Sequence, residues 1–424
     1  MQDNEKKPAL RFKGFTDPWE QRKLDEIANF SKGVGYSKND LCEEGTPIIL
    51  YGRLYTKYET SIFDVDTFVK GKAGSVYSKG GEVIVPASGE TAEDISIASV
   101  VVKPGILLGG DLNIVSPTTE YDSAFLALTI SSGAAHKYLS SLAQGKSVVH
   151  LHNADIQSVS AKFPTKREQE KIHLLFGKID TLITLHQRKY EKLVNIKKSM
   201  LNKMFPPNGA SVPEIRFKGF TDPWEQRKLD EEFDFTVPNN TLSRAELNQE
   251  SGSVRNVHYG DVLIKYGSVL DVQNDELPFI TGRSKDDFKG ALLQNGDIII
   301  ADTAEDETTG KVCEIVNIQD KDVVAGLHTM VCRPKNKTAE GYFGYYMNSS
   351  SYHHQLLPLM QGIKVLSLSK TNVQKTTVKY PKDKAEQQKI ADCLRRIDTL
   401  ITLHQRKLEK LQNIKKSCLE KMFV

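Results

Sequence analysis

The stretch that decides the fold is IDTLITLHQRK, residues 179–189, which recurs without a change as residues 397–407. The match continues on both sides: Glu168-Gln169 and Lys171-Ile172 return 218 residues later, and so does the NIKKS run that starts at Asn195. A segment as long as a long helix is therefore duplicated within the chain.

Both copies have a narrow apolar stripe, at the first and fourth positions of a heptad counted from Ile172 or Ile390. Such stripes are typical of helices that pair with another helix, and the nearest candidate partner is the duplicate itself. His and Lys interrupt each stripe near its middle, which lowers stability but can fix the register. The predicted helix-pairing residues are Ile172, Ile179, Leu182, His186, Leu193 and Ile196 in the first copy and Ile390, Ile397, Leu400, His404, Leu411 and Ile414 in the second.

The composition is that of an ordinary soluble globular protein. A chain of 424 residues, 39% hydrophobic and 26% charged, is expected to hold two or more domains. No run approaches the roughly 18 apolar residues of a membrane span, and the N-terminal residues lack the apolar core of a signal peptide. We therefore expect a cytoplasmic protein that has no membrane partner. The five scattered cysteines predict reduced thiols rather than a disulfide framework.

The net charge of +3 hides an asymmetry along the chain. Residues 164–204 contain 10 Lys or Arg against 4 Asp or Glu, and residues 381–422 contain 11 against 6. The remaining residues contain 36 basic against 44 acidic side chains. The globular parts therefore lack a bulk positive field, and any nucleic-acid function must depend on local patches or on partners.

A second repeat precedes each globular part: RFKGFTDPWEQRKLDE, residues 11–26, recurs as residues 216–231. Its offset is 205 rather than 218, so the second half has gained 13 residues between its two repeats. The Asp-Pro step in each copy predicts a short helix that begins at Pro18 and at Pro223. The only two tryptophans lie in these copies, and we interpret them as packing anchors rather than base-stacking residues.

Between the repeats, residues 30–163 contain short runs rich in Val and Ile, bounded by Gly and Pro, which predict strands. The second half reproduces the order of these runs with little identity; Gln144-Gly145, for example, corresponds to Gln361-Gly362. We therefore predict an α+β fold with approximate two-fold symmetry inside one chain. Its predicted parts are two homologous globular domains, residues 1–163 and 206–380, and two repeated helices, residues 164–205 and 381–424.

No catalytic motif stands above background. An adenine methyltransferase needs a glycine loop for its cofactor and an Asn/Asp-Pro-Pro-aromatic run for the flipped base, and the Asp-Pro-Trp runs here lack the second proline. A P-loop for ATP is also missing. The acidic residues 302–307 predict a solvated loop, and ten histidines without H-x-x-x-H spacing do not indicate zinc. We predict no cofactor, no metal and no catalytic residue in this chain.

At this point the pattern resembles a known family, the specificity subunits of Type I restriction-modification enzymes. The resemblance covers nearly the whole chain and rests on the WEQRKL anchors, the YG…KY elements, the EQEKI and EQQKI helix starts, and the IDTLITLHQRK copies. It implies two target-recognition domains, each reading one half of a bipartite double-stranded DNA site. It also implies that the helices pair antiparallel, set the spacing and dock two methyltransferase subunits, which restriction-motor subunits then join. S-adenosylmethionine, ATP and Mg are expected in those partners, because the resemblance implies that this subunit makes and breaks no bonds.

The resemblance does not supply the residues that contact bases, so we choose polar, basic and aromatic residues in loops beside the shared strands. For each one, a plain surface or packing role is the alternative. The candidates for DNA binding are Tyr36, Lys38, Arg53, Lys57, Tyr58, Ser88, Gln144 and Lys146 in the first domain and Arg255, His258, Tyr259, Lys265, Arg283, Lys364, Ser367 and Lys370 in the second.

Two other classes of protein are kept as alternatives. A scaffold that assembles other proteins without reading DNA fits the acidic balance of the globular parts. A self-contained DNA-modifying enzyme is disfavoured by the missing cofactor motifs. The target bases, the spacer length and the face that docks the methyltransferase cannot be read from the sequence.

Overall fold

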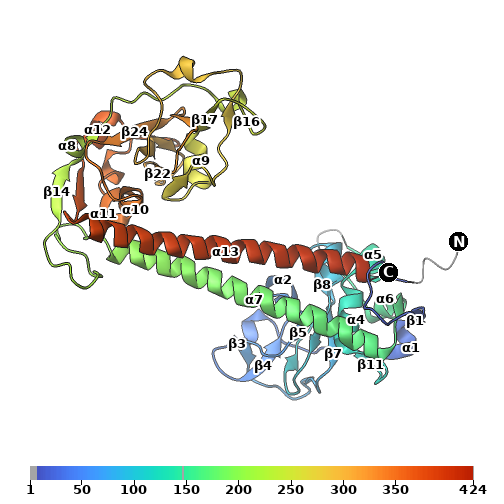
Figure 1. The fold of residues 1–424 in the computed structure, drawn as a ribbon. Coiled ribbons are helices and arrows are strands. Elements are labelled where there is room, and N and C mark those ends of the chain that lie inside the picture. The colour runs from blue at the N-terminus through green and yellow to red at the C-terminus, as the bar shows by residue number, and fades with distance from the viewer. Residues whose placement is uncertain (1–6, 146–147, 424) are drawn as a thin grey trace. The chain divides into compact units, whose positions relative to one another are not determined.

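The computed structural model describes residues 7–145 and 148–423. The chain forms two compact units, unit 1 (Met1–Arg188 with Gln405–Val424) and unit 2 (Lys189–His404). Each unit therefore combines one globular head with part of each long helix, α7 (Lys166–Lys203) and α13 (Lys384–Met422) (Figure 1). Both helices lie inside the ranges predicted for them.

Head 1, the globular part of unit 1, is built around a five-stranded sheet of order β2-β11-β7-β9-β5 and a smaller sheet of order β10-β4-β6-β3. Two short ladders, β1-β13 and β8-β12, complete it. The strands are β1 (Glu20–Lys23), β2 (Ala28–Lys32), β3 (Leu41–Cys42), β4 (Thr46–Ile49), β5 (Ser61–Ile62), β6 (Phe68–Val69), β7 (Glu82–Pro86), β8 (Ser88–Gly89), β9 (Ser99–Val101), β10 (Leu107–Leu108), β11 (Leu112–Pro117), β12 (Val149–His150) and β13 (Ser160–Phe163). The helices are α1 (Leu24–Ile27), α2 (Arg53–Thr56), η2 (Lys38–Asp40), α3 (Ala92–Ile95), α4 (Ser123–Ile130), α5 (Gly133–Leu142) and α6 (Asn153–Gln157).

Head 2, the globular part of unit 2, has the same topology, with sheets of order β15-β24-β20-β22-β18 and β16-β19-β17-β23 and ladders β14-β26 and β21-β25. The strands are β14 (Glu225–Lys228), β15 (Phe233–Asp234), β16 (Leu247–Asn248), β17 (Val254–Val257), β18 (Val269–Asp271), β19 (Phe279–Ile280), β20 (Ile298–Ala301), β21 (Thr303–Ala304), β22 (Val312–Val316), β23 (Asp322–Ala325), β24 (Thr329–Pro334), β25 (Leu366–Ser367) and β26 (Thr377–Tyr380). The helices are α8 (Leu229–Glu232), η3 (Arg244–Glu246), α9 (Tyr259–Ile264), η4 (Lys285–Phe288), α10 (Tyr342–Met347), α11 (Ser350–His353), η5 (Leu357–Leu359) and α12 (Lys370–Gln374). The shared order of elements confirms the predicted α+β fold and its internal repeat.

The middle strands explain why the sequence shows unbroken apolar runs there. Every residue of β7 and of β20 is buried, because both faces of each strand are covered, and such strands lose the alternation of half-exposed ones. The helix predicted to begin at Pro18 and at Pro223 is wrong: the residues that follow form the strands β1 and β14, which pair antiparallel with β13 and β26. Pairing with a strand more than 130 residues away overrides the local capping signal.

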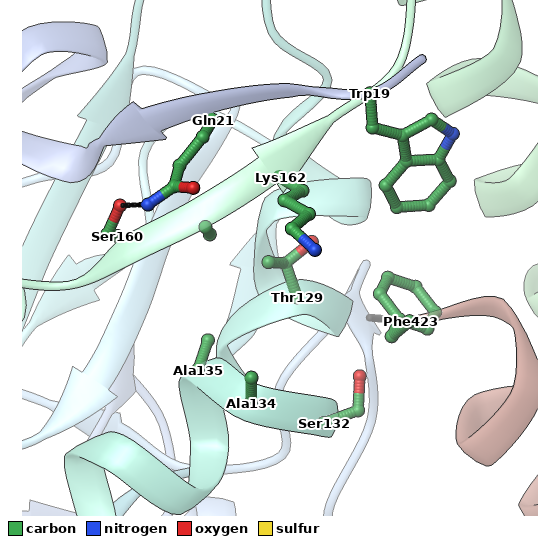
Figure 2. A pocket seen from close by; sticks show the side chains of 10 residues that line it. Trp19, Gln21, Thr129, Ser132, Ala134, Ala135, Ser160, Lys162 and Phe423 are labelled. Atoms are coloured by element: carbon green, nitrogen blue, oxygen red, sulfur yellow. Dashed lines mark hydrogen bonds between the residues drawn. The ribbon is translucent and has the colours of Figure 1, made fainter. Parts of the chain in front are cut away.

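Each tryptophan packs in the core of its own unit, as predicted. The Trp19 ring lies 5.8 Å from the Phe125 ring, and Phe423, just beyond α13, stacks on Phe125 at 5.4 Å. A cavity of about 110 Å³ lies beside Trp19 and Phe423 (Figure 2), which is too small for a drug-sized ligand. In unit 2, Phe205, just beyond α7, packs against Trp224 at 6.3 Å. The end of each long helix is thus sealed into a core by a Met-Phe pair.

The two long helices contact each other within both units. In unit 1, Lys415 Nζ of α13 lies 2.6 Å from Asp180 Oδ1 of α7. In unit 2, Lys197 Nζ of α7 lies 2.6 Å from Asp398 Oδ1 of α13. Positions 180 and 398 are equivalent in the repeat, and so are positions 197 and 415. In each unit the beginning of one helix lies against the end of the other, so the helices pair antiparallel.

The buried side of each helix differs from the predicted stripe in one respect. Residues at the first heptad position, such as Ile179 and Ile397, are buried or half-buried, but the second contact falls four residues later rather than three. Leu182 and Leu400 are therefore 42% exposed and Ile414 is 40% exposed, while the residues that follow each of them are half-buried. This corrects the pairing prediction for Leu182, Leu400 and Ile414. The sequence is consistent with a second contact either three or four residues after Ile179, because Leu182 is followed by another apolar residue, Ile183.

Among the described residues, no helix is both long and apolar enough to cross a membrane.

Candidate nucleic-acid interface

A buried ion pair fixes each head to the start of its long helix. The Arg11 guanidinium contacts the Glu168 carboxylate through two hydrogen bonds of 2.7 Å, and the Glu168 side chain is fully buried. Arg216 and Glu386 repeat the arrangement in unit 2 at 2.7 and 2.8 Å. Two parallel N–H···O bonds fix an angle as well as a distance. The duplicated Arg-Phe and Glu-Gln positions therefore orient the heads on the helices.

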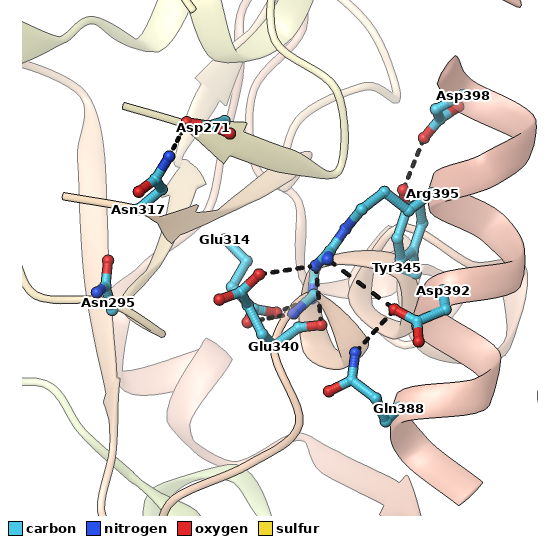
Figure 3. Close-up of polar contacts among 12 residues, drawn as sticks. Asp271, Asn295, Glu314, Asn317, Glu340, Tyr345, Gln388, Asp392, Arg395 and Asp398 are labelled. Atoms are coloured by element: carbon cyan, nitrogen blue, oxygen red, sulfur yellow. Dashed lines mark hydrogen bonds and ion pairs between the residues drawn. The ribbon is translucent and has the colours of Figure 1, made fainter. Parts of the chain in front are cut away.

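Further along the helices, each helix–helix ion pair also touches its head. In unit 1, Asp180 lies 3.2 Å from Thr60 Oγ1, and Lys415 Nζ lies 5.8 Å from the centre of the Tyr58 ring. In unit 2, Tyr345 donates a hydrogen bond of 2.8 Å to Asp398 (Figure 3). Each head is therefore fixed to the helix pair at two points, which pre-organises the surface that it presents.

On head 1, polar side chains gather where β7 ends and β11 begins. The Ala87 N–H donates to the Asp111 carbonyl at 2.8 Å, and Asp111 has a left-handed φ of 57°. Beside it, Ser88 pairs with His150 across β8 and β12, and the Ser88 hydroxyl lies 3.1 Å from His150 Nδ1. His150 is bridged in turn to Gln144. We call Ser88, Asp111, Gln144 and His150 the strand-end row of head 1.

The same end of the sheet in head 2 has the same backbone pattern, with a glutamine again at one position and other side chains at the rest. The Asp302 N–H donates to the His328 carbonyl at 3.1 Å, and His328 has a left-handed φ of 54°. Thr303 pairs with Ser367 across β21 and β25, and its hydroxyl lies 3.4 Å from His328 Nδ1. Ser367 is bridged to Gln361. The strand-end row of head 2 is Thr303, His328, Gln361 and Ser367.

A tight Gln-Gly hairpin borders each row. Gly145 and Gly362 have φ values of 145° and 128°, and a Cβ on either would come within 1.9 Å of a carbonyl oxygen across the hairpin. Only glycine fits such a position. In head 2 the hairpin tip is open to solvent, with Ile363 99% exposed and Lys364 exposed beside it. The predicted residue Lys146 lies outside the described residues.

Three of the residues predicted in head 1 lie at or beside its row. Ser88 and Gln144 belong to it, and Tyr36 follows Gly35, whose carbonyl accepts from the Gly110 N–H at 2.6 Å. The Tyr36 hydroxyl is held by Ser75 at 2.6 Å. The prediction of these three residues as DNA contacts stays a prediction. Lys38 is exposed in η2, on the same turn.

The other residues predicted in head 1 have structural contacts. Arg53 is only 8% exposed and lies within 3.0 Å of both Asp66 and Glu59. Lys57 also pairs with Asp66 at 2.9 Å, and these two cations lower the pKa of Asp66 to about 2. Tyr58 donates to a backbone carbonyl at 3.2 Å. These contacts hold loops in place, which favours the packing alternative for all three predicted residues.

In head 2, Tyr259 and Ser367 lie at the row, since the Tyr259 ring is 5.3 Å from the His328 ring. The His258 ring packs at a tilt against the Tyr259 ring, with 4.7 Å between the ring centres. Burial, helped by the Arg244 charge, lowers the pKa of His258. Lys364 lies at the hairpin tip. The remaining predicted residues lie elsewhere: Arg255 covers the Phe279 ring, Lys265 donates to the Glu276 carbonyl, Arg283 is exposed before η4, and Lys370 is exposed at the start of α12.

Sequence reasoning missed His150, Asp111, Thr303, His328 and Gln361. One signal could have found Gln361, because it matches the predicted Gln144 at the offset of 217 that applies there. Extending that offset gives the pairs Asp111/His328 and His150/Ser367, whose side chains differ. The left-handed backbone at Asp111 and His328 gives no signal in the sequence, because neither is a glycine.

These observations define a class of protein: two heads of one topology, with unlike side chains at equivalent surface positions, attached to a pair of repeated antiparallel helices. Residues 16–195 and 221–413 each match the family model described as the Type I restriction modification DNA specificity domain. The chain belongs to this family, the specificity subunits of Type I restriction-modification systems.

The chain is also similar to individual proteins. The chain is 22% identical over 360 residues to the Type I restriction enzyme MjaVIII specificity subunit of Methanocaldococcus jannaschii, covering 82% of this chain and 80% of the relative. The crystal structure of the Type I S subunit from M. genitalium matches with a TM-score of 0.64 at 14% identity over 99% of both chains. The HsdS subunit of Thermoanaerobacter tengcongensis matches over 96% of both chains at 16% identity, with a TM-score of 0.43.

Proposed function

We propose that head 1 reads one half of a bipartite double-stranded DNA site, that head 2 reads the other half, and that the chain itself catalyses no reaction. The observation that supports this most is the pair of strand-end rows, in which one backbone arrangement presents Asp111 and His150 in head 1 but His328 and Ser367 in head 2. Base edges are distinguished by their pattern of donors and acceptors. Two heads of one shape with unlike rows are therefore suited to two different half-sites.

In this proposal, methylation of adenine and ATP-dependent cleavage take place in partner subunits, with S-adenosylmethionine, ATP and Mg bound there. The heads carry more acidic than basic residues, so we infer that much of the attraction to DNA phosphates comes from those partners. Exposed cations such as Lys364 and Lys370 add local phosphate contacts, which position a protein on DNA without reading sequence.

The test is to assemble the full chain with its methyltransferase subunits and to map methylated adenines on random-sequence DNA. We expect one bipartite motif. Replacing residues 30–163 by the matching region of another family member should change one half of the motif and keep the other half and the spacer. If both halves change, or neither does, the assignment of one half-site to each head fails. A protein that only assembles partners would give no sequence motif at all.

We also propose that the methyltransferase subunits dock on the exposed apolar face of each long helix. Leu182 and Leu185 of α7 are 42% and 44% exposed, and their equivalents Leu400 and Leu403 of α13 are 42% and 43% exposed. The helix pair does not need these side chains, yet both copies retain them. Two identical apolar patches suit two copies of one partner, since large exposed apolar side chains gathered together mark interaction sites.

Introducing negative charge on this apolar face tests the docking. The double variant Leu182→Glu, Leu185→Glu should reduce the stoichiometry from two methyltransferase subunits per chain to one, measured by native mass spectrometry. Thr184→Glu, an exposed position on the same turn, is the matched control and should retain both subunits. Binding of two methyltransferase subunits to the double variant would refute this docking face while leaving DNA reading by the heads untouched.

A further inference from the structure

One position in the strand-end rows has the same backbone conformation in both heads but a different side chain in each. Asp111 and His328 each stand directly before the strand that pairs with the middle of the sheet, β11 or β24. Both have a left-handed backbone, with φ of 57° and 54°, which residues other than glycine adopt at a cost. In both heads the carbonyl of this residue accepts a hydrogen bond from the residue after the neighbouring strand. The two side chains therefore start from the same place.

Around Asp111 the carboxylate is exposed at the end of the row. Its charge is close enough to Tyr55 to contribute to the raised pKa of that phenol, whose main cause is burial. Tyr55 itself donates to the Ser88 carbonyl at 2.5 Å. A carboxylate only accepts hydrogen bonds. It is also repelled by phosphates, so on a DNA-facing surface it suits the groove rather than the backbone.

Around His328 the neighbours fix the ring. The Thr303 hydroxyl donates to Asp302 at 2.8 Å, which leaves its oxygen free to accept from His328 Nδ1 at 3.4 Å. Asp302 lies 3.5 Å from the same Nδ1, and the Tyr259 ring packs edge-on at 5.3 Å. With a proton held on Nδ1, the ring presents Nε2 for a further contact.

We propose that Asp111 and His328 are specificity-determining residues, each contacting one base of the half-site read by its own head. The inference rests on the proposed function of the heads. The Asp111 carboxylate selects a base with an exocyclic amino group in the major groove, either cytosine N4 or adenine N6. His328 presents an imidazole at the equivalent position, so head 2 discriminates among bases at that position by a different pattern.

Asparagine variants test the proposal without disturbing the backbone, because asparagine is among the few residues that tolerate a left-handed φ. The full chain, assembled with its methyltransferase subunits, is tested on DNA randomised in both half-sites, and methylated adenines are mapped. Asp111→Asn should shift the preference at one base of one half-site by roughly 5- to 150-fold, the range that one good base contact provides, toward adenine, whose N6 and N7 pair with an amide. His328→Asn should do the same at one base of the other half-site only.

Gln319→Asn is the matched control, because Gln319 is also a left-handed residue of head 2, with φ of 46°, but follows β22 at the opposite end of the sheet. It should leave the motif unchanged. As a gain of function, His328→Asp should move the preference in its half-site toward cytosine or adenine. An unchanged motif in both asparagine variants, or a change in both half-sites from either one, overturns the inference while the bipartite motif of the natural chain persists. If the natural chain gives no bipartite motif, the proposed function itself fails, and this inference with it.

Discussion

Removal of the Glu168 carboxylate is expected to destabilise unit 1 strongly. Glu168 is fully buried and the Arg11 side chain is only 12% exposed, so Glu168→Ala leaves a guanidinium without its counter-ion in a site that water barely reaches. Breaking such a pair by deleting one partner costs about 3–5 kcal/mol of unfolding free energy. For a unit of this size that corresponds to a fall in melting temperature of roughly 6–20 °C. The double variant Arg11→Met, Glu168→Leu should recover most of the loss, because no charge is then buried alone.

Tryptophan fluorescence during urea unfolding can report unit 1 by itself. The chain has two tryptophans, and Trp224→Phe leaves Trp19, which lies in the core of unit 1, as the sole emitter. In that background Lys57→Ala is the exposed-pair control, since Lys57 and Asp66 are 54% and 65% exposed, and it should cost about 1 kcal/mol or less. If Glu168→Ala costs no more than Lys57→Ala, or if the double variant is as unstable as Glu168→Ala, the role given to the buried pair is wrong.

Three further predictions concern other parts of the fold. Phe423→Ala should lower the unfolding free energy of unit 1 by about 3–5 kcal/mol, measured by urea unfolding. The reason is that the Phe423 side chain is only 6% exposed in the core. A loss below about 1 kcal/mol would contradict the packing of the residue after α13 into that core. Ile183→Asp should destabilise the helix pair in thermal melts, because Ile183 faces the other helix, whereas Leu182→Asp should change the unfolding free energy by about 0.5 kcal/mol or less. Equal effects of the two substitutions would mean that Leu182 also contacts the other helix, as the sequence predicted. Burial raises the pKa of Glu314 to about 7, although hydrogen bonds from two backbone N–H groups at the start of α10 oppose the rise. Figure 3 shows the surroundings of Glu314. The contribution of Glu314 to the free energy of unfolding is therefore fully present below about pH 4.5 and is lost as the pH rises through about 7. The unfolding free energy of the natural chain should therefore fall relative to that of Glu314→Gln between these pH values, by on the order of 3 kcal/mol, and a pH-independent difference would contradict the raised pKa.

The architecture could be predicted because it depends on repeats and on long apolar periods. The IDTLITLHQRK copies predicted both long helices, and the apolar runs around β7 and β20 predicted strands. The residues through which the helices contact each other were harder to predict. Leu182 and Ile183 are adjacent and both apolar, so two different sets of contact positions are consistent with the sequence. Only the packing of one helix against the other decides between them. The helix predicted at Pro18 failed for a related reason, since β13 is far away in the sequence.

The sequence predicted only those residues of the candidate site whose side-chain type itself suggests hydrogen bonding to DNA. Ser88, Gln144, Tyr259 and Ser367 were chosen as polar loop residues, and they lie at the strand-end rows. Arg53 was chosen by the same rule, but its charge is used by two carboxylates within its own head. A sequence does not say which cations are already paired. That information comes from side chains brought together across the fold.

The repeated residues of this chain fall into two groups, those that are buried and those that are exposed, and their identity has a different explanation in each group. Where a repeated residue is buried, as at Glu168 and Glu386, packing alone explains why both copies keep it. Where a repeated residue is exposed, as at Leu185 and Leu403, packing gives no reason for identity, and the proposed docking of one kind of partner on both copies gives one. The strand-end rows show the converse, because Asp111 and His328 occupy the same backbone position and differ in chemistry. In the proposed function, the surfaces that meet two copies of one partner are alike, and the surfaces that meet different halves of one DNA site differ.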